Sequence, residues 1–221
     1  MEKRTLRTQV AVRGDESFAP ASAWPVISYD WRAGLPVLRG AHVTLRELRL
    51  SDATTLLTML NAEEVMRFAS PAPASVEAFE RFILWTQRQR AEGNYVCFGI
   101  VPDGYEDAVG IIQVRQTEPG FDTAEWGVAL GSAFWGTGVF DESARLVVEF
   151  VFETLGTHRL EARAAVANGR GNGALRKLGA VQEGVLRKSF LRNGQYLDQI
   201  LWTIVDEDWR LARTGTRTRV H

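Results

Sequence analysis

The sequence predicts a mixed α/β fold of the α+β kind, in which a strongly twisted sheet is flanked by helices. Segments that alternate between apolar and polar residues indicate half-buried strands, and they are interleaved with segments of helical periodicity. Near the end of the chain, Asn193-Gly194 separates two alternating segments, which is the strongest short signal for a β-hairpin. In the middle, a glycine turn at 135–138 leads from a strand directly into a long apolar helix.

Each element has its own local signal. Strands are expected at about 42–48, 95–101, 108–116, 123–130, 159–166, 184–191 and 195–205. Helices are expected from Ser51-Asp52 to Asn61, from about 75 to 92, from the glycine turn to Leu155, from the loop at 168–173 to Leu178, and from Asp206 onwards. Ser51 and Asp52 are of the residue types that cap helix N-termini, while Gly93, Gly156 and Gly179 follow helix ends.

The chain divides into one domain and two short flanks. Residues 37–212 form the expected domain, residues 213–221 a frayed tail, and residues 1–36 an extended arm rich in prolines and small residues. The arm carries Trp24, Tyr29 and Trp31, an aromatic content that argues against free disorder. We therefore expect the arm to pack either on its own domain or on a second subunit, and the second case would give a homodimer.

Composition excludes several classes of protein. The hydrophobic share of 45% is that of a globular protein, and the net charge of −1 favours neither nucleic acid nor an anionic membrane as a partner. The sequence has neither an apolar run of membrane-spanning length nor a signal peptide, so the expected location is the cytoplasm. Cys97 is the one cysteine, which excludes an intrachain disulfide and a thiolate metal cluster, and it is expected to be a small buried hydrophobe. No metal site is expected, because no metal-ligand spacing occurs.

The glycine turn has a chemical use. Glycines at 136 and 138 allow the backbone to approach a ligand closely, and the first N–H groups of the following helix have no partner within the helix. These N–H groups lie at the positive end of the helix dipole and suit a phosphate or pyrophosphate. The alternative is a plain turn between a strand and a helix.

In combination, the motifs resemble those of the GNAT acyltransferases, and within them the RimJ/RimL type of N-acetyltransferase. The resemblance covers about residues 38–210. It is carried by Ala124-Glu125-Trp126-Gly127-Val128, Trp135-Gly136-Thr137-Gly138 with Glu142, His158-Arg159-Leu160-Glu161-Ala162, Asn168 with Lys177-Leu178-Gly179-Ala180, Glu183-Gly184-Val185-Leu186-Arg187, and Gly194-Gln195-Tyr196-Leu197-Asp198-Gln199.

The resemblance implies acetyl-CoA as donor and a primary amine as acceptor, which react directly in a ternary complex. The pyrophosphate would bind backbone N–H groups of Phe134, Trp135, Gly136, Thr137, Gly138 and Val139. The pantetheine arm would lie between the strand at Val128, Ala129 and Leu130 and the strand at 164–166, with a hydrogen bond from Asn168. Gly171, Asn172 and Lys177 complete the implied cofactor-binding set, and Lys177, Arg170 and Arg176 are candidates for the 3′-phosphate of coenzyme A.

The sequence departs from the family where a general acid is often found. Many GNAT enzymes have Gln or Arg at the position of Ala133, Tyr at Leu175 and, in the RimJ/RimL type, Ser at Gly171. A glutamate that serves as base in some RimL enzymes corresponds to Phe190. A strong acid is not essential, because a free thiol has a pKa of about 8.5 and the coenzyme leaves readily as a thiolate.

Glu125 is the candidate catalytic base, acting directly or through water. The alternative is that Glu125 pairs with an arginine of a neighbouring strand. Tyr196 and Asp198 are candidates for binding the acceptor, and the alternative for both is a solvent-facing strand position. Because an α-amine (pKa about 8) is more often neutral than a lysine amine (pKa about 10.4), a small catalytic set favours a protein N-terminus as acceptor. A small-molecule amine, such as an antibiotic, polyamine or amino acid, is the alternative acceptor, and a non-catalytic acyl-CoA-binding or sensing module is the alternative function.

Overall fold

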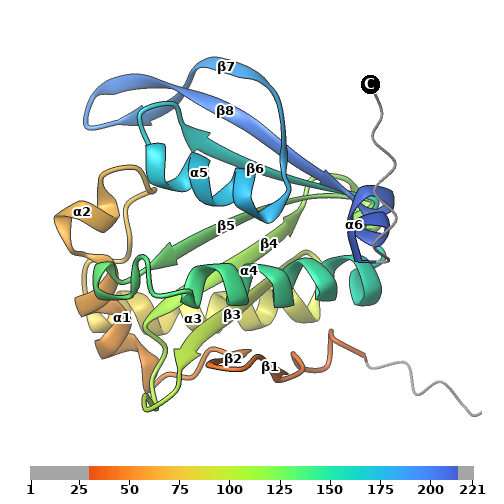
Figure 1. The fold of residues 1–221 in the computed structure, drawn as a ribbon. Helices are drawn as coiled ribbons and strands as arrows, with labels where there is room; N and C mark the ends of the chain where they lie inside the picture. Colours follow the sequence, from red (N-terminus) through yellow and green to blue (C-terminus); the bar gives the residue numbers. More distant parts are fainter. Residues whose placement is uncertain (1–29, 214–221) are drawn as a thin grey trace, which may run out of the picture.

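The computed structural model describes residues 30–213, which form one eight-stranded sheet with helices on both faces (Figure 1). The strand order is β1-β2-β3-β4-β5-β6-β8-β7. The strands are β1 (Leu38–Arg39), β2 (Val43–Glu47), β3 (Tyr95–Pro102), β4 (Gly110–Gln116), β5 (Thr123–Leu130), β6 (Arg159–Ala165), β7 (Val181–Arg192) and β8 (Gln195–Val205). Among these strands, only β5 and β6 pair in parallel, and the helical segment 139–155 supplies the long connection that a parallel pair requires.

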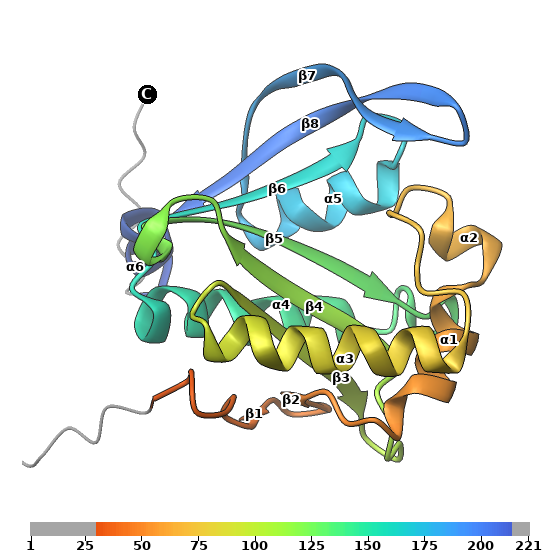
Figure 2. The same ribbon diagram turned by 180° about the vertical axis from the view of Figure 1, so that it is seen from behind.

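The helices form one layer on each face of the sheet. They are α1 (Asp52–Leu60), α2 (Glu63–Met66), α3 (Val76–Ala91), α4 (Val139–Phe150), α5 (Gly169–Leu178) and α6 (Asp206–Arg213). Two 3₁₀ turns (Pro119–Phe121 and Ser132–Phe134) and a π-helical turn (Val151–Leu155) that prolongs α4 complete the set. Figure 2, seen from behind, places α3 in front of the sheet, whereas α4 is in front in Figure 1. No helix in residues 30–213 is long and apolar enough to cross a membrane.

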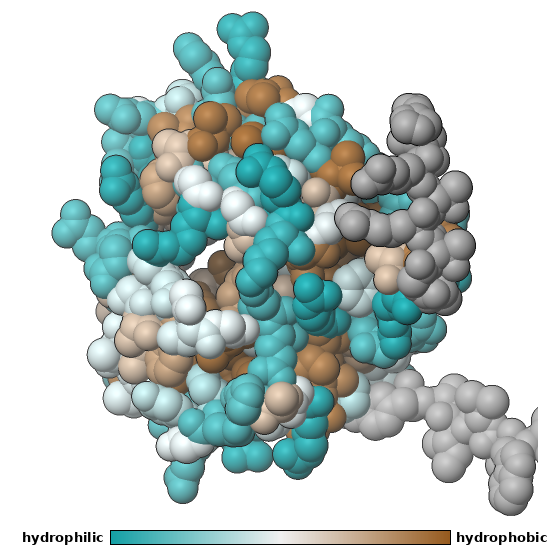
Figure 3. Space-filling view, in the orientation of Figure 1, coloured by the Kyte–Doolittle hydropathy of each residue, from teal (hydrophilic) through white to brown (hydrophobic). Residues whose placement is uncertain are grey.

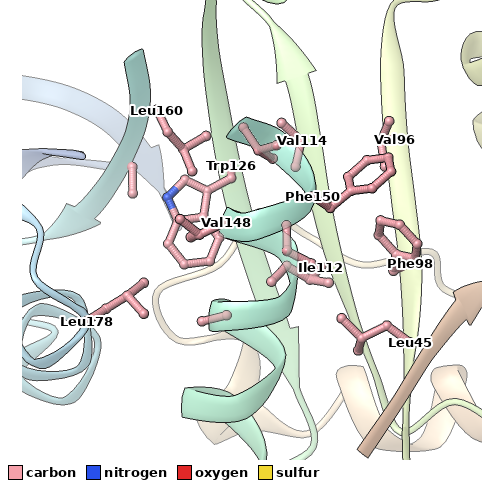
Figure 4. Packing of buried hydrophobic residues seen from close by; sticks show 14 of the residues in the cluster. Leu45, Val96, Phe98, Ile112, Val114, Trp126, Val148, Phe150, Leu160 and Leu178 are labelled. Carbon is pink, nitrogen blue, oxygen red and sulfur yellow. The ribbon is translucent and has the colours of Figure 1, made fainter. Parts of the chain in front are cut away.

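Alternation along the strands gives each face its own core. On the α4 side, Phe98 of β3 and Ile112 and Val114 of β4 pack against Val148 and Phe150 of α4 (Figure 4). The rings of Phe98 and Phe150 meet edge to face, with centroids 5.2 Å apart. On the other side, a second cluster joins α1 and α3 to the sheet, and Cys97 is buried in it as expected. The glycine turn and its helix are therefore fixed by a fully packed layer.

The folded unit begins before residue 37. Trp31 and Leu35, which were predicted to belong to the arm, are buried, and the Trp31 ring meets Phe121 edge to face at 5.6 Å. Arg90 of α3 donates hydrogen bonds to the carbonyls of Trp31 and Arg32. Trp31 therefore packs on its own domain, while Trp24 and Tyr29 lie outside the described residues.

The start of α1 differs from the prediction, because the Ser51 side chain caps nothing and Asp52 organises the turn instead. The buried carboxylate of Asp52 accepts two 2.8 Å hydrogen bonds from Arg46, one from the Arg49 amide at 2.7 Å and one from the Ala108 amide at 2.9 Å. Burial alone would raise the pKa of Asp52, but these hydrogen bonds outweigh it and hold the pKa below its usual value. The cluster ties α1 to β2 and to the loop before β4.

Other boundaries also differ. The structure adds β1 and α2, which are too short to produce a periodic pattern, and β7 begins at Val181 rather than at 184.

Candidate functional site

The sheet opens between β5 and β6. The two strands pair only from Thr123 to Glu125 and from Arg159 to Glu161. Beyond that point β4 accompanies β5 to Leu130 and β8 accompanies β6 to Ala165, while β5 and β6 diverge (Figure 1). The predicted segments Val128–Leu130 and 164–166 lie on the two sides of this opening. On the edges that face it, alternate backbone N–H and C=O groups have no sheet partner.

Two cavities meet in the opening. One, of about 770 Å³, extends towards the glycine turn, and the other, of about 740 Å³, extends over β4 and β5 towards α3. Figure 3 shows the face of Figure 1 hollowed to the left of its centre. The residues that line both cavities are Val65, Phe68, Ala69, Val128, Ala129, Phe140, Asn168 and Gly171. We call the first the turn cavity and the second the strand cavity.

The glycine turn has the conformation expected of an anion site. Gly136 and Gly138 have φ of +76° and +92°, and nothing lies within 4 Å of a Cβ placed on either. The backbone is therefore left-handed and open to the turn cavity, which Trp135, Gly136, Thr137 and Gly138 all line. Phe134 and Val139 are buried in the core behind the turn, so only their backbone is close to it. The Thr137 hydroxyl donates to the Phe134 carbonyl at 2.7 Å and so stabilises the turn itself.

Charged residues surround the turn cavity. Lys177 forms an ion pair with Asp141, and both line the cavity. Arg170 lies over the Trp135 ring, 4.0 Å from its centroid, whereas Arg176 lies over Trp202 and does not line either cavity. The Glu142 carboxylate faces away, because it accepts hydrogen bonds from the amides of Ala41 and His42.

Asn168 and Asn172 have different roles at the start of α5. The Asn168 side chain caps the helix by accepting from the Gly171 amide at 2.9 Å, and it lines both cavities. Asn172 is buried and lines neither cavity, contrary to its place in the implied cofactor-binding set. Its amide donates to the Ala165 carbonyl at 2.9 Å and accepts from the Trp202 indole at 2.9 Å. Asn172 therefore fixes the loop that presents Asn168.

Glu125 forms the arginine pair that the sequence offered as the alternative to a catalytic role, and it also lies at a cavity. Its carboxylate accepts from Arg115 at 2.9 Å and lies 3.4 Å from Arg163 of the neighbouring strand, yet it also lines the strand cavity. Arg163 and Gln113 line the same cavity, and sequence analysis identified neither. Gln113 lies opposite Gly127 in the register of β4 and β5, a pairing that only the structure shows.

The two predicted acceptor residues do not reach the cavity. Tyr196 is 63% exposed, and Asp198 accepts a 2.7 Å hydrogen bond from the Lys188 amide. Lys188 has φ of +49° and belongs to a bulge in β7 between Leu186 and Phe190. The bulge brings Phe190 to the strand cavity, which Gln199 of β8 also lines, so β7 and β8 contribute to the site through residues other than those predicted.

Two of the positions that depart from the family pattern, Leu175 and Gly171, lie at the cavities. Leu175 is buried and lines the strand cavity, and Gly171 lines both cavities. Among the described residues that line the two cavities there is no tyrosine, cysteine or histidine. His158 lies elsewhere and hydrogen-bonds Asp206 at 2.9 Å.

Comparisons with known proteins agree on one family. The model of the acetyltransferase (GNAT) domain matches residues 42–181. Spermidine N(1)-acetyltransferase of Escherichia coli is 27% identical over 172 residues, which is 76% of this chain and 89% of that protein. The [ribosomal protein uS5]-alanine N-acetyltransferase of E. coli is 24% identical over 123 residues, which is 55% of this chain and 63% of that protein.

A solved structure shares the fold. RimJ of Mycobacterium smegmatis, solved in complex with CoA-disulfide, superposes with a TM-score of 0.72 at 22% identity, covering 85% of this chain and 97% of that one. Since the family model spans well over half of the chain and the diverging strands, glycine turn and helices occur together, the chain belongs to the GNAT family of acetyltransferases.

Proposed function

We propose that the protein transfers the acetyl group of acetyl-CoA to a primary amine, and that the acceptor is the α-amine of a polypeptide. The observation that carries this proposal is the opening between β5 and β6, where the turn cavity and the strand cavity meet. A donor bound from one side and an acceptor bound from the other would meet at Val128 and Ala129, which line both cavities.

The turn cavity fits coenzyme A as a substrate. The left-handed glycines expose backbone amides at the start of α4, and helix N-termini of this kind favour phosphate groups. Arg170 and Lys177 add positive charge at the same cavity. The region shared with the strand cavity is lined mostly by apolar residues and suits the uncharged pantetheine arm. Asn168, at its border, supplies a polar contact.

The strand cavity supplies the groups that the transfer needs. In this proposal Glu125, which lines the strand cavity, accepts a proton from the amine, directly or through water. In the same proposal an N–H group of β5 near Val128 or Ala129, on the edge that β6 leaves open, stabilises the developing oxyanion. The leaving thiolate needs little protonation at neutral pH. Because this catalytic set is small, we expect the orientation of acetyl-CoA and the amine to be the main contribution of the protein to the rate.

The acceptor assignment rests on the chemistry of the cavity. An α-amine is neutral roughly one time in ten at pH 7 and needs less help from a base than a lysine amine does. The uS5-alanine relative acts on a ribosomal protein according to its name, which agrees with a polypeptide acceptor. The spermidine relative represents the alternative, a small polyamine.

Calorimetric titration with acetyl-CoA, with NAD and ATP as controls, tests the donor half. We expect saturable binding of acetyl-CoA alone, followed by release of free thiol when peptides with a free N-terminus are added. A folded protein that does not bind acetyl-CoA would contradict the proposal, and binding without thiol release to any amine would indicate a sensing module instead.

A further inference from the structure

The strand cavity carries information about the acceptor that the family does not supply. We propose that the acceptor is the α-amine of an uncharged, apolar amino-terminal residue, whose first carbonyl is bound by the side-chain amide of Gln113. This inference rests on the proposed acetyl transfer and specifies its acceptor.

The first argument is charge. Glu125 and Arg163 are the charged residues among those described that line the strand cavity, and their side chains lie 3.4 Å apart. The cavity therefore has one carboxylate for the reacting amine and none for a second ammonium group. A polyamine or a lysine-like side chain would lose its hydration without gaining an ion pair. An acidic first residue would bring a second carboxylate to a cavity whose one described cation, Arg163, is already paired with Glu125.

The second argument is the apolar wall. Most of the residues that line the strand cavity but not the turn cavity are apolar. The apolar wall is made of residues from four elements and one loop: Leu60 of α1, Phe79 and Phe82 of α3, Ile111 of β4, Phe190 of β7, and Pro71 and Pro73 of the loop before α3. Such a wall gains from covering an apolar side chain and offers no polar partner to a charged one.

The third argument is a donor without a partner. The Tyr95 hydroxyl donates to Oε1 of Gln113, which fixes the orientation of the amide. Nε2 of Gln113 then lies 3.5 Å from the position that a Cβ on Gly127 would occupy, and it donates to no acceptor among the described residues. Because Gly127 has no side chain, this N–H donor faces open space two residues from Glu125. A carbonyl that follows the reacting amine, as in every peptide, is the group that fits it.

Phe190 links the wall to the β7–β8 hairpin. The bulge between Leu186 and Phe190 is held by the hydrogen bond from the Lys188 amide to Asp198, and the Ser189 hydroxyl donates to Oε1 of Gln199, which also lines the cavity. Asp198 is thus a positioning residue for the acceptor wall rather than a direct contact.

The first experiment compares acceptors on the unmodified full chain. Peptide amides of one sequence that begin with Leu, Met, Asp or Lys, together with spermidine, are assayed by thiol release from acetyl-CoA. We expect kcat/KM for the Leu and Met peptides to exceed that of the others by about tenfold or more. A preference for spermidine or for the Lys or Asp peptide would overturn the inference while leaving acetyl transfer intact. No release with any amine, despite acetyl-CoA binding, would overturn both.

The second experiment tests the carbonyl contact. Gln113→Met is expected to raise KM for the Leu peptide about tenfold, with KM for acetyl-CoA unchanged and with no change in kcat/KM for isoamylamine, which has no carbonyl. Gln182→Met, at an exposed position of β7 away from both cavities, is the matched control. An equal loss on the peptide and on isoamylamine would overturn the role of Gln113.

The third experiment tests the wall. Phe190→Ala is expected to reduce the preference for Leu over Asp peptides, and Leu191→Ala, at the next residue of β7, which is 55% exposed, is expected to leave it unchanged. A preference unaffected by Phe190→Ala in a protein that retains its melting temperature would contradict an apolar first-residue site.

Discussion

A substitution in the glycine turn can separate two effects: backbone strain, which lowers stability, and damage to the proposed phosphate site, which lowers affinity for acetyl-CoA. Gly136→Ala places a methyl group on a residue with φ of +76°, and nothing lies within 4 Å of the new atom, so the protein itself offers no clash. Left-handed backbone costs an L-residue roughly 1–2 kcal/mol, which the reduced freedom of the unfolded chain offsets in part. We therefore expect a loss of about 1 kcal/mol in unfolding free energy, or about 2–4 °C in melting temperature.

The effect of Gly136→Ala on binding should be larger than its effect on stability. The methyl group projects into the turn cavity and would disturb one or two hydrogen bonds to a phosphate group, each of which contributes about 1.5–3 kcal/mol. The Kd for acetyl-CoA should then rise at least tenfold, as measured by calorimetry.

Gly104→Ala is the matched control for this substitution. Gly104 lies in the turn between β3 and β4, has φ of +81° and is equally open. Gly104→Ala should lower the melting temperature by the same amount and leave the Kd unchanged. If both variants bind acetyl-CoA as the unmodified protein does, or if both lose affinity equally, the turn is not the phosphate site.

The remaining predictions concern charged residues. Glu125→Gln is expected to lower kcat about 100-fold without changing the affinity for acetyl-CoA. Glu161→Gln, on β6 and outside both cavities, is the control and should leave kcat unchanged. Equal kcat values for the two variants would exclude Glu125 as the base. Arg170→Ala should raise the Kd for acetyl-CoA several-fold at low salt and by less at high salt, because salt screens the charge interaction. Arg176→Ala should leave the Kd unchanged at both salt concentrations, and calorimetry measures both variants. Asp52→Asn should lower the unfolding free energy at pH 7 by about 3–5 kcal/mol, because it leaves a buried arginine without its carboxylate. Folding lowers the pKa of Asp52, so its contribution to stability is complete above the pKa of the unfolded state, about 3.9, and is lost as the pH falls below that value. The unfolding free energies of the variant and the unmodified protein, measured by urea titration, should therefore converge at low pH.

The sequence predicted most of the fold because the long elements have strong periodic signals. The apolar helix after the glycine turn and the hairpin around Asn193-Gly194 lie where they were expected. Four-residue α2 and two-residue β1 have no period to detect, although α2 is adjacent to both cavities. The periodicity of the strands could not show that β5 and β6 separate after Glu125, because that depends on how each strand pairs with its outer neighbour. The opening between them was expected only from the family resemblance.

The parts of the candidate site that are built from local backbone conformation were predictable from the sequence. The parts that depend on side-chain contacts between distant elements were less predictable. The turn at Gly136 and the helix cap at Asn168 are properties of local sequence, and both lie at the cavities. The acceptor side depends on tertiary contacts. A bulge in β7 turns Phe190 towards the cavity and engages Asp198 in holding the backbone, and neither effect can be inferred from the alternation of the strand.

The position of Cys97 allows thiol labelling to detect local opening between α3 and β3. This single thiol lies on β3, in the middle of the sheet, where burial raises its pKa. A thiol reagent therefore reacts with it only when the α3 layer separates from β3, or on global unfolding. The rate of labelling under native conditions measures the free energy of that separation, and its change on adding acetyl-CoA measures how far an occupied turn cavity stabilises the opposite layer of the molecule.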